Sequence, residues 1–297
     1  MEAPVRVRSH AKLNLTLDVT GIKDGYHLLD SFVASVSLAD DIALRPRADE
    51  KIVLAMHGEG SEGIPPAGNA ALRAAERFRQ KYGTRGAEIE IEKHIPVGAG
   101  LGGSSADAAG VLRGMSALYG IKDGAGMKEL ADGLGSDTGY MLGGGYARMT
   151  GRGEIVEPVA ENAVLWFLLL CPPSPVLTAA CYGEYDREHA AGGVRRETEN
   201  CLRAFQKGDL AAMGRHFHNA LFAPACRLNP AVKRAAEEAA ALSPLGYGMT
   251  GSGSAVFALF GTGEEAERAR GRYRGACRAL TVCTLPAGEG AQAPEEN

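Results

Sequence analysis

The chain has 297 residues, of which 45% are hydrophobic and 23% are charged, and its formal net charge is -4. This length allows two modest domains with a sizeable core, and the composition is that of an ordinary globular protein. The charge balance gives no general attraction to nucleic acid or to an anionic membrane. The longest apolar run, residues 163–173, is about half of the roughly 20 residues that a membrane-spanning helix needs. We therefore expect neither a nucleic acid nor a membrane as partner.

The cysteine pattern indicates the cellular compartment. None of the six belongs to a C-x-x-C pair or has the spacing of a metal finger. This pattern is typical of free thiols in a reducing compartment. The sequence thus predicts a cytoplasmic protein.

The first third of the chain is predicted to be mostly strands. Alternating apolar residues indicate strands at residues 6–18, 31–38, 41–45 and 87–95. The pair Asp40-Asp41 is typical of a turn and separates the second of these strands from the third. Asn69 precedes an apolar pattern of helical period and is predicted to cap a helix.

Residues 96–109, PVGAGLGGSSADAA, are the most informative stretch. They follow a predicted strand and lead into a helix, which we expect to begin at the serines, with Ser104 and Asp107 as its capping box. Glycines allow the backbone to approach a phosphate closely, and a helix N-terminus presents free N–H groups to an anion. The hydroxyls of Ser104 and Ser105 would lie near a phosphate oxygen or a bound Mg²⁺. The alternative is a glycine-rich structural turn.

Several kinds of phosphate site can be weighed against this loop. Gly98, Gly100 and Gly103 fit G-x-G-x-x-G, the pattern of a dinucleotide-binding Rossmann loop. That unit requires an acidic residue at the end of a strand about 20 positions later, whereas Asp123 lies in a loop directly after the helix. The G-x-x-x-x-G-K-[ST] pattern of P-loop enzymes is absent, as are H-R-D and D-F-G of protein kinases.

The second half of the chain is predicted to form another domain. A short helix at 127–134 leads to a glycine-rich segment, and a buried strand at 163–170 opens the new domain. Helical periodicity predicts helices at residues 200–205, 210–216, 231–241 and 263–273. A second glycine loop lies between strand-like flanks in residues 246–260. We expect an N-terminal domain at 1–157, a C-terminal domain at 158–285 and a disordered tail at 286–297.

Residues 96–109 resemble the phosphate-binding motif of the GHMP kinases, and other segments match in the right order. AKLN at 11–14 and DGYHLLDS at 24–31 form the most specific pair, and they resemble the opening of the 4-diphosphocytidyl-2-C-methyl-D-erythritol kinases. LGSDTGYMLGGGYARMTGRGE resembles the segment with the catalytic aspartate of that family, and MTGSGSAVFALF resembles the third GHMP motif.

This resemblance implies a two-domain α/β (α+β) GHMP kinase fold. The N-terminal domain would be ribosomal-protein-S5-domain-2-like and the C-terminal domain ferredoxin-like. The activity implied is ATP-dependent phosphorylation of the 2-hydroxyl of 4-diphosphocytidyl-2-C-methyl-D-erythritol, a step of the non-mevalonate route to isoprenoid precursors. ATP and Mg²⁺ would be required, and the partner would be a small molecule that carries cytidine diphosphate. The protein would be a monomer or a homodimer.

The matching positions imply roles for individual residues. Asp137 would orient or deprotonate the acceptor hydroxyl, and Lys12 would stabilise the charge beside it. ATP would bind at Asn69, Pro96, Val97, Gly98, Ala99, Gly100, Leu101, Gly102, Gly103, Ser104, Ser105 and Ala106, with Mg²⁺ at Ser105. The acceptor substrate would bind at Asn14, Tyr26, His27, Thr178, Tyr182, Gly251 and Ser252, with the cytosine held between Tyr26 and Tyr182.

The chain departs from the family pattern at one place near the site. Family members have Asp-Val-Pro-Phe after the catalytic acid, whereas this chain has Asp137-Thr138-Gly139-Tyr140. Three alternatives stay open at this point. They are another GHMP kinase of the homoserine, mevalonate or sugar type, a Rossmann-type oxidoreductase, and a binding protein without catalytic activity.

Overall fold

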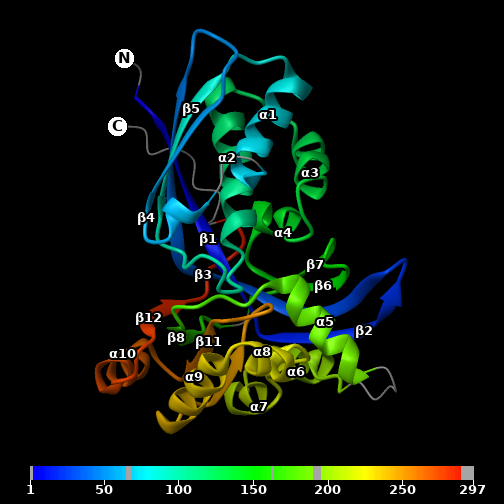
Figure 1. Ribbon diagram of the computed structural model, residues 1–297, viewed down its shortest axis with the longest axis vertical. Helices are drawn as coiled ribbons and strands as arrows, with labels where there is room; N and C mark the ends of the chain where they lie inside the picture. Colours follow the sequence, from blue (N-terminus) through cyan, green and yellow to red (C-terminus); the bar gives the residue numbers. More distant parts are fainter. Residues whose placement is uncertain (1–2, 65–67, 162, 190–194, 289–297) are drawn as a thin grey trace.

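Two β-sheets, each with helices packed against it, make up the chain (Figure 1). The computed structural model describes residues 3–64, 68–161, 163–189 and 195–288. The eight-stranded first sheet contains β1 (Val5–Asn14), β2 (Thr16–Lys23), β3 (Tyr26–Pro46), β4 (Val53–Gly58), β5 (Ala87–Lys93), β6 (Tyr146–Gly151), β7 (Ile155–Val159) and β9 (His218–Asn219).

Strand β3 organises the first sheet. It pairs antiparallel with β1, β2, β5 and β6 along its 21 residues. The turn predicted at Asp40-Asp41 is therefore wrong, since β3 runs through it. Asp40 is fully buried, and its Oδ1 accepts hydrogen bonds from the backbone N–H groups of His94 (2.6 Å) and Ile95 (2.8 Å). These long-range partners stabilise Asp40 in a strand, although its residue type is typical of turns.

Helices cover one face of this sheet. They are α1 (Ala70–Tyr82), α2 (Gly103–Tyr119), α3 (Gly124–Asp132) and α4 (Thr138–Gly143), and a short 3-10 turn, η1 (Ser61–Gly63), follows β4. Figure 1 shows α1 and α2 side by side against the sheet, with α3 outside them. The alternation predicted for β5 is confirmed, because Ile89 and Ile91 are fully buried beneath these helices while the glutamates between them face solvent.

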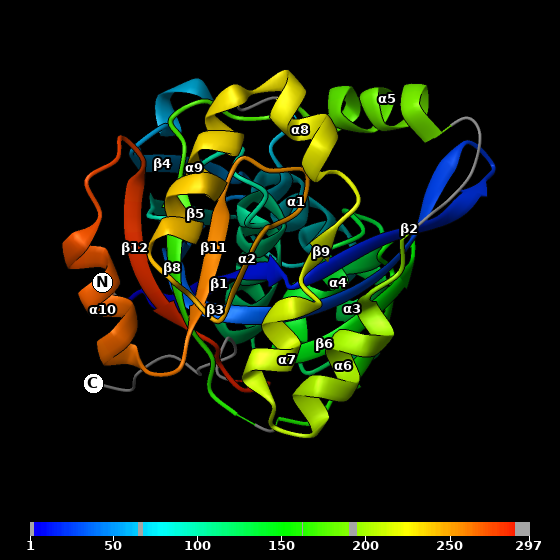
Figure 2. The same cartoon turned by 90° about the horizontal axis from the view of Figure 1, so that it is seen from below.

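The second sheet has the strand order β10-β11-β8-β12, with every pair antiparallel. Its strands are β8 (Trp166–Cys171), β10 (Gly246–Met249), β11 (Val256–Phe260) and β12 (Arg278–Cys283). Its helices are α5 (Thr178–His189), α6 (Thr198–Gln206), α7 (Leu210–Arg215), α8 (Phe222–Leu228), α9 (Pro230–Ala241) and α10 (Gly263–Arg272), which Figure 2 shows from below. This order is that of a ferredoxin-like βαββαβ unit, with α5 to α9 as the first connection.

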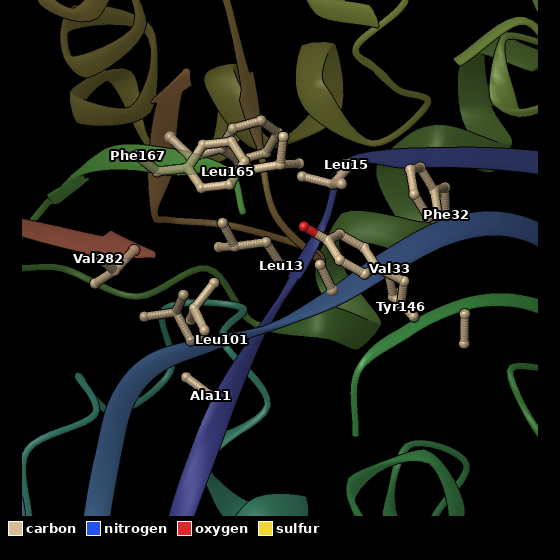
Figure 3. Close-up of a cluster of buried hydrophobic side chains, with 14 of the residues drawn as sticks. Ala11, Leu13, Leu15, Phe32, Val33, Leu101, Tyr146, Leu165, Phe167 and Val282 are labelled. Carbon is tan, nitrogen blue, oxygen red and sulfur yellow. The ribbon is translucent and has the colours of Figure 1, made fainter. Parts of the chain in front are cut away.

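A shared hydrophobic cluster joins the two sheets (Figure 3). Leu13 and Phe32 from the first sheet, and Leu15 between β1 and β2, pack in one cluster with Phe167 and Val282 from the second sheet. Leu101 of the glycine loop belongs to the same cluster. The loop is thus anchored by a buried side chain between the two sheets, which positions it relative to both.

The end of the chain differs in part from the sequence prediction. The predicted disordered tail begins at residue 286, yet Gly288 donates a backbone hydrogen bond to the carbonyl of Gly143 at 3.1 Å. Residues 289–297 lie outside the described residues. No helix within the described ranges is long and apolar enough to cross a membrane.

Candidate active site

Two cavities adjoin at the glycine loop. The smaller, of about 410 Å³, is lined by the loop residues 96–105 together with Met56, Asn69 and Lys93. The larger, of about 1060 Å³, is lined by residues from both domains, among them Lys12 and Asp137. Gly100, Gly102 and Thr178 line both cavities, so the two meet at these residues.

The glycine loop leaves the N-terminus of α2 without a side-chain cap. Gly98, Gly100 and Gly102 have positive φ angles of 69°, 79° and 74°, which glycine adopts at little cost. Helix α2 begins at Gly103 with Gly102 as its N-cap, and no side chain accepts from its first N–H groups. The predicted capping box of Ser104 and Asp107 is therefore wrong. The free N–H groups of the first turn can instead bind an anion.

Hydrogen bonds from both domains hold this loop. The backbone N–H of Lys12 donates to the carbonyl of Leu101 at 3.0 Å, and that of Ala255 donates to Ala99 at 3.0 Å. A Cβ atom on Gly100 would lie 2.3 Å from the carbonyl oxygen of Thr250. Only glycine at this position lets the first glycine loop pack so closely against the second.

Lys12 and Asp137 form an ion pair at the wall of the larger cavity. The Nζ of Lys12 lies 3.4 Å from Oδ2 of Asp137, and the two side chains are 5% and 31% exposed. Lys12 comes from β1, and Asp137 is the residue before α4. A buried ammonium beside a partly exposed carboxylate stabilises charge and leaves the carboxylate open to a ligand.

Asn14 links this pair to the second glycine loop. Its Oδ1 accepts a hydrogen bond from Nζ of Lys12 and another, at 3.1 Å, from the backbone N–H of Gly251. Its Nδ2 donates to Oγ of Ser31 at 2.8 Å. Nearby, the hydroxyls of Thr178 and Ser252 are hydrogen bonded at 2.9 Å. The four predicted substrate residues Asn14, Thr178, Gly251 and Ser252 thus lie along one wall.

An aromatic cluster around His27 and Tyr182 lies at the larger cavity. The ring of His27 stacks on Tyr182 with centroids 4.5 Å apart, and its edge meets Tyr185 at 5.9 Å. Nε2 of His27 lies 2.7 Å from Oδ1 of Asp186. Tyr182 and Asp186 both belong to α5, a helix absent from our sequence prediction, so one helical turn of α5 supplies both contacts.

Tyr26 lies at the same cavity but contacts a different group. It is 56% exposed, and the guanidinium carbon of Arg152 lies 4.8 Å from its ring centroid. Tyr26 and Tyr182 thus both line the cavity, while their ring contacts in the structure are Arg152 and His27 respectively. Arg152 and Asp186 were not among the predicted site residues, and no local pattern in the sequence distinguishes them.

A buried ion cluster behind the smaller cavity was also missed. Nζ of Lys93 contacts Asp40 and lies 2.6 Å from Oδ2 of Asp107, and all three side chains are buried. Burial raises the pKa of Asp107 to about 7. The alternation in β5 could have revealed Lys93, because it lies two residues after Ile91 on the buried face.

The remaining predicted nucleotide residues divide into two groups. Asn69 caps α1 by accepting from the N–H of Ala71 at 2.9 Å, and it lines the smaller cavity with Pro96, Val97, Ser104 and Ser105. Ala106 lines neither cavity, because it is buried in α2 with its carbonyl bound to the Ser9 hydroxyl.

Within the described part of the chain, no group of three or more His, Cys, Asp or Glu residues could hold a metal ion. The oxygen donors that line the two cavities include the hydroxyls of Ser104 and Ser105 and the carboxylates of Asp107 and Asp137, and such donors suit Mg²⁺. Mg²⁺ usually takes only one or two protein ligands alongside phosphates and waters.

Comparison with known proteins agrees with this geometry. Residues 69–146 match the GHMP kinases N terminal domain, and residues 201–279 match the GHMP kinases C terminal domain. A 4-diphosphocytidyl-2-C-methyl-D-erythritol kinase of Pelotomaculum thermopropionicum is 38% identical over 90% of this chain and 92% of its own length. The enzyme of the same name from Symbiobacterium thermophilum is 38% identical over 95% of this chain and 100% of its own.

Solved structures point the same way. A crystal structure of 4-(cytidine 5'-diphospho)-2C-methyl-D-erythritol kinase superposes with a TM-score of 0.77 at 33% identity, over 94% of this chain and 99% of that one. A homoserine kinase from Cytophaga hutchinsonii reaches a TM-score of 0.72 at 17% identity, over 98% of this chain and 97% of that one, which shows the shared fold alone.

These findings decide between the families considered. A Rossmann unit places its loop in a mostly parallel sheet. Here β5, the strand before the loop, belongs to a mixed sheet: it pairs parallel with β4 and antiparallel with β3, and most of the other pairs are antiparallel. The predicted two-domain α/β kinase fold is confirmed by both domain matches and by the superposition. The chain belongs to the GHMP kinase family and, within it, to the 4-diphosphocytidyl-2-C-methyl-D-erythritol kinases.

Proposed function

We propose that this chain transfers the γ-phosphoryl group of ATP to the 2-hydroxyl of 4-diphosphocytidyl-2-C-methyl-D-erythritol, in the non-mevalonate route to isoprenoid precursors. The observation that carries the proposal is the position of the Lys12–Asp137 ion pair, in the wall of the larger cavity where it joins the glycine-loop cavity. A phosphate donor on the loop and an acceptor in the larger cavity would meet beside this pair.

Asp137 and Lys12 have different tasks in this proposal. Phosphoryl transfer requires mainly positioning and charge stabilisation from the protein. The Asp137 carboxylate accepts a hydrogen bond from the acceptor hydroxyl, directs its oxygen toward the phosphorus and takes its proton as the new bond forms. The buried Lys12 ammonium lies beside Asp137 and stabilises the charge on the phosphoryl oxygens.

The glycine loop holds the donor. The free N–H groups at the start of α2 bind phosphate oxygens. The side chains of Met56, Asn69, Pro96 and Val97, which line the smaller cavity, surround the nucleoside. Mg²⁺ would be held by the phosphates with the Ser105 hydroxyl as a protein ligand, and when bound it neutralises phosphate charge.

The aromatic cluster holds the acceptor. Cytosine can stack on the exposed face of Tyr26 in place of the Arg152 guanidinium, with Tyr182 as the second ring, and His27 meets its polar edge. A base stacked on an aromatic side chain gains about 1–3 kcal/mol per ring. Asn14, Thr178 and Ser252 line the same cavity as the cluster and Lys12 and would bind the phosphorylated chain of the acceptor.

The domain division and the assembly are part of the same proposal. The sheet changes between β7 and β8, and the predicted boundary at 157/158 lies within β7. We propose a cytoplasmic enzyme that is active as a monomer or a homodimer, since the described site is built within one chain.

The test measures ADP release with Mg-ATP and four acceptors in turn: the cytidine substrate, homoserine, mevalonate and galactose. We expect turnover only with the cytidine compound. Asp137→Ala should lower kcat by about 10²–10⁴-fold while its circular dichroism stays that of the wild type. Turnover with another acceptor would reassign the substrate, and near-wild-type turnover by a folded Asp137→Ala protein would remove the proposed chemistry.

A further inference from the structure

A third cavity, of about 770 Å³, lies in the C-terminal domain and belongs to neither cavity of the candidate active site. Its walls are the end of α7, strand β9, the start of α8 and the edge strand β10. The volume is within the range of about 300–1,000 Å³ that is typical of small-molecule sites. Nothing in the proposed phosphoryl transfer uses this space.

The lining of this cavity is apolar at its floor and cationic at its rim. Phe217, Phe222 and Met249 contribute apolar surface, while Arg195 and Arg215 supply guanidinium groups. Among the described residues, no aspartate or glutamate lines the cavity. Both arginines are exposed, so a ligand can reach them from solvent.

The two arginines differ in how far they are already neutralised. Nε of Arg195 lies 2.8 Å from Oε1 of Glu197. The other N–H groups of Arg195 do not contact this carboxylate. Arg215 makes no ion pair with any described residue, although acidic residues are more numerous than basic ones in the chain as a whole. An unpaired guanidinium beside an apolar cavity suits an anion that also has an apolar part.

A peptide strand is a poorer occupant than a small molecule. Strand β10 has only four residues, and a Cβ atom on Gly246 would lie 2.4 Å from Cα of Gly214, so α7 already covers the first part of this edge. The exposed ring of Tyr247 and the side chain of Leu245 border the remaining opening.

We propose that this cavity binds a small amphipathic organic phosphate, with the phosphate at Arg215 and Arg195 and the apolar group against Phe217, Phe222 and Met249. Two guanidinium groups suit the double charge of a phosphate monoester better than the single charge of a carboxylate.

Side-chain contacts connect this cavity to the active site. Tyr185 lines it, and the same ring meets the edge of His27, which stacks on Tyr182. Asn219 also lines it, and its Nδ2 donates to the carbonyls of Met249 and Gly251 at 2.8 Å each. A ligand in the cavity therefore packs directly behind the proposed cytosine cluster and the second glycine loop, and its binding changes the affinity for a cytidine ligand. This coupling rests on the proposed function.

The first experiment measures binding of naphthyl phosphate by its fluorescence, with ADP and cytidine diphosphate present to occupy the active site. Inorganic phosphate and naphthol serve as probes of the two halves of the ligand. We expect saturable binding of naphthyl phosphate and at least tenfold weaker binding of either half.

Variants locate the site. Arg215→Gln should weaken the binding of naphthyl phosphate by about tenfold, the loss of affinity expected when one charged hydrogen-bonding partner is removed. Ala223→Trp places a ring into the opening from an exposed position and should abolish binding. Arg6→Gln, at an exposed arginine of β1, is the matched control and should bind as the wild type does. Binding that neither pocket variant alters, or no saturable binding, would overturn the proposal.

The coupling is tested separately by repeating the titration without cytidine diphosphate. By linkage, each ligand must change the other's affinity by the same factor, and we expect at least a threefold change. An unchanged affinity would overturn the coupling while the binding site stands. Because neither assay depends on turnover, failure of the proposed kinase activity leaves the binding result readable.

Discussion

The Oδ1 atom of Asn14 accepts hydrogen bonds from both Nζ of Lys12 and the backbone N–H of Gly251, so one amide oxygen joins the two domains at the site. The lysine and the asparagine come from the first strand, and Gly251 comes from the second glycine loop, 237 residues later in the chain than Asn14. The position of the Lys12 ammonium is thus tied to the position of that loop.

Replacing Asn14 should therefore affect both domains at once. Asn14→Leu keeps a similar volume but leaves the N–H of Gly251 without its acceptor. We expect the free energy of unfolding to fall by about 1–3 kcal/mol, the usual result of leaving a buried polar group unpaired, and kcat to fall as well. Ser31→Ala is the control, because it removes the partner of the Asn14 Nδ2 and the donor to the carbonyl of Thr16 but leaves the Asn14 Oδ1 in place. Urea denaturation and steady-state kinetics measure both; an equal kcat for the two variants would contradict the link between Asn14 and catalysis.

Tyr182 should contribute to substrate affinity more than to the chemical step. Tyr182→Ala removes the ring on which His27 stacks at 4.5 Å. Since stacking on an aromatic ring is worth about 1–3 kcal/mol, KM for the cytidine substrate should rise roughly 5–150-fold, while KM for ATP stays unchanged. Tyr182→Phe retains the ring and should restore most of the affinity. A matching rise in KM for ATP would show that the change reaches beyond the aromatic cluster.

The buried cluster of Lys93, Asp40 and Asp107 should make stability depend on pH. Burial raises the pKa of Asp107 to about 7, above the value of about 3.9 in an unfolded chain. The native state therefore holds a proton that the unfolded state has lost between about pH 4 and 7, and this stabilisation declines as the pH rises through that window.

Asp107→Asn removes this titration and keeps a side chain of the same shape. Between pH 5 and pH 8 the free energy of unfolding of the variant, relative to that of the wild type, should increase by at least about 1 kcal/mol. Urea denaturation at both pH values measures this difference. Asp24→Asn, at an exposed aspartate in the β2–β3 turn, should show no such gain. Parallel pH profiles for wild type and Asp107→Asn would contradict the raised pKa.

The contact between the two glycine loops predicts a contrast between two glycines with similar backbone angles. Gly100 has φ +79°, and an added Cβ would lie 2.3 Å from the backbone oxygen of Thr250, whereas Gly120 has φ +65° and open space around it. Gly120→Ala should lower the free energy of unfolding by about 1–2 kcal/mol, because alanine is strained in the left-handed conformation. Gly100→Ala should cost about 1–3 kcal/mol more from overpacking, and it should also raise KM for ATP. Thermal unfolding measures the stability of both variants, and steady-state kinetics measure KM for ATP. Equal effects of the two substitutions on stability and KM would show that the loops can separate without loss of stability or ATP affinity.

The local patterns of the sequence determined most of the elements. Strict alternation at residues 87–93 specifies a half-buried strand, because successive side chains of a strand point to opposite faces. Asn69 before a helical pattern predicted the cap that the structure contains. The run of glycines before α2 predicted a special loop at this point, since glycine adopts the positive φ angles found there at little cost. The two-domain kinase fold and its family were implied by a resemblance to the GHMP kinases, which residues 11–14, 24–31 and 96–109 and two later segments carry in the right order.

Only the tertiary structure decided which polar groups are buried and with what partner. Asp40 and Asp107 look like turn and cap residues in any local window, yet both contact Lys93 in the core. Arg152 lies over Tyr26, and Asp186 binds His27, through contacts between segments far apart in the chain. Sequence periodicity reports which face of an element is apolar, whereas the partner of a buried charge depends on desolvation and on how sheets and helices pack, which no local pattern contains.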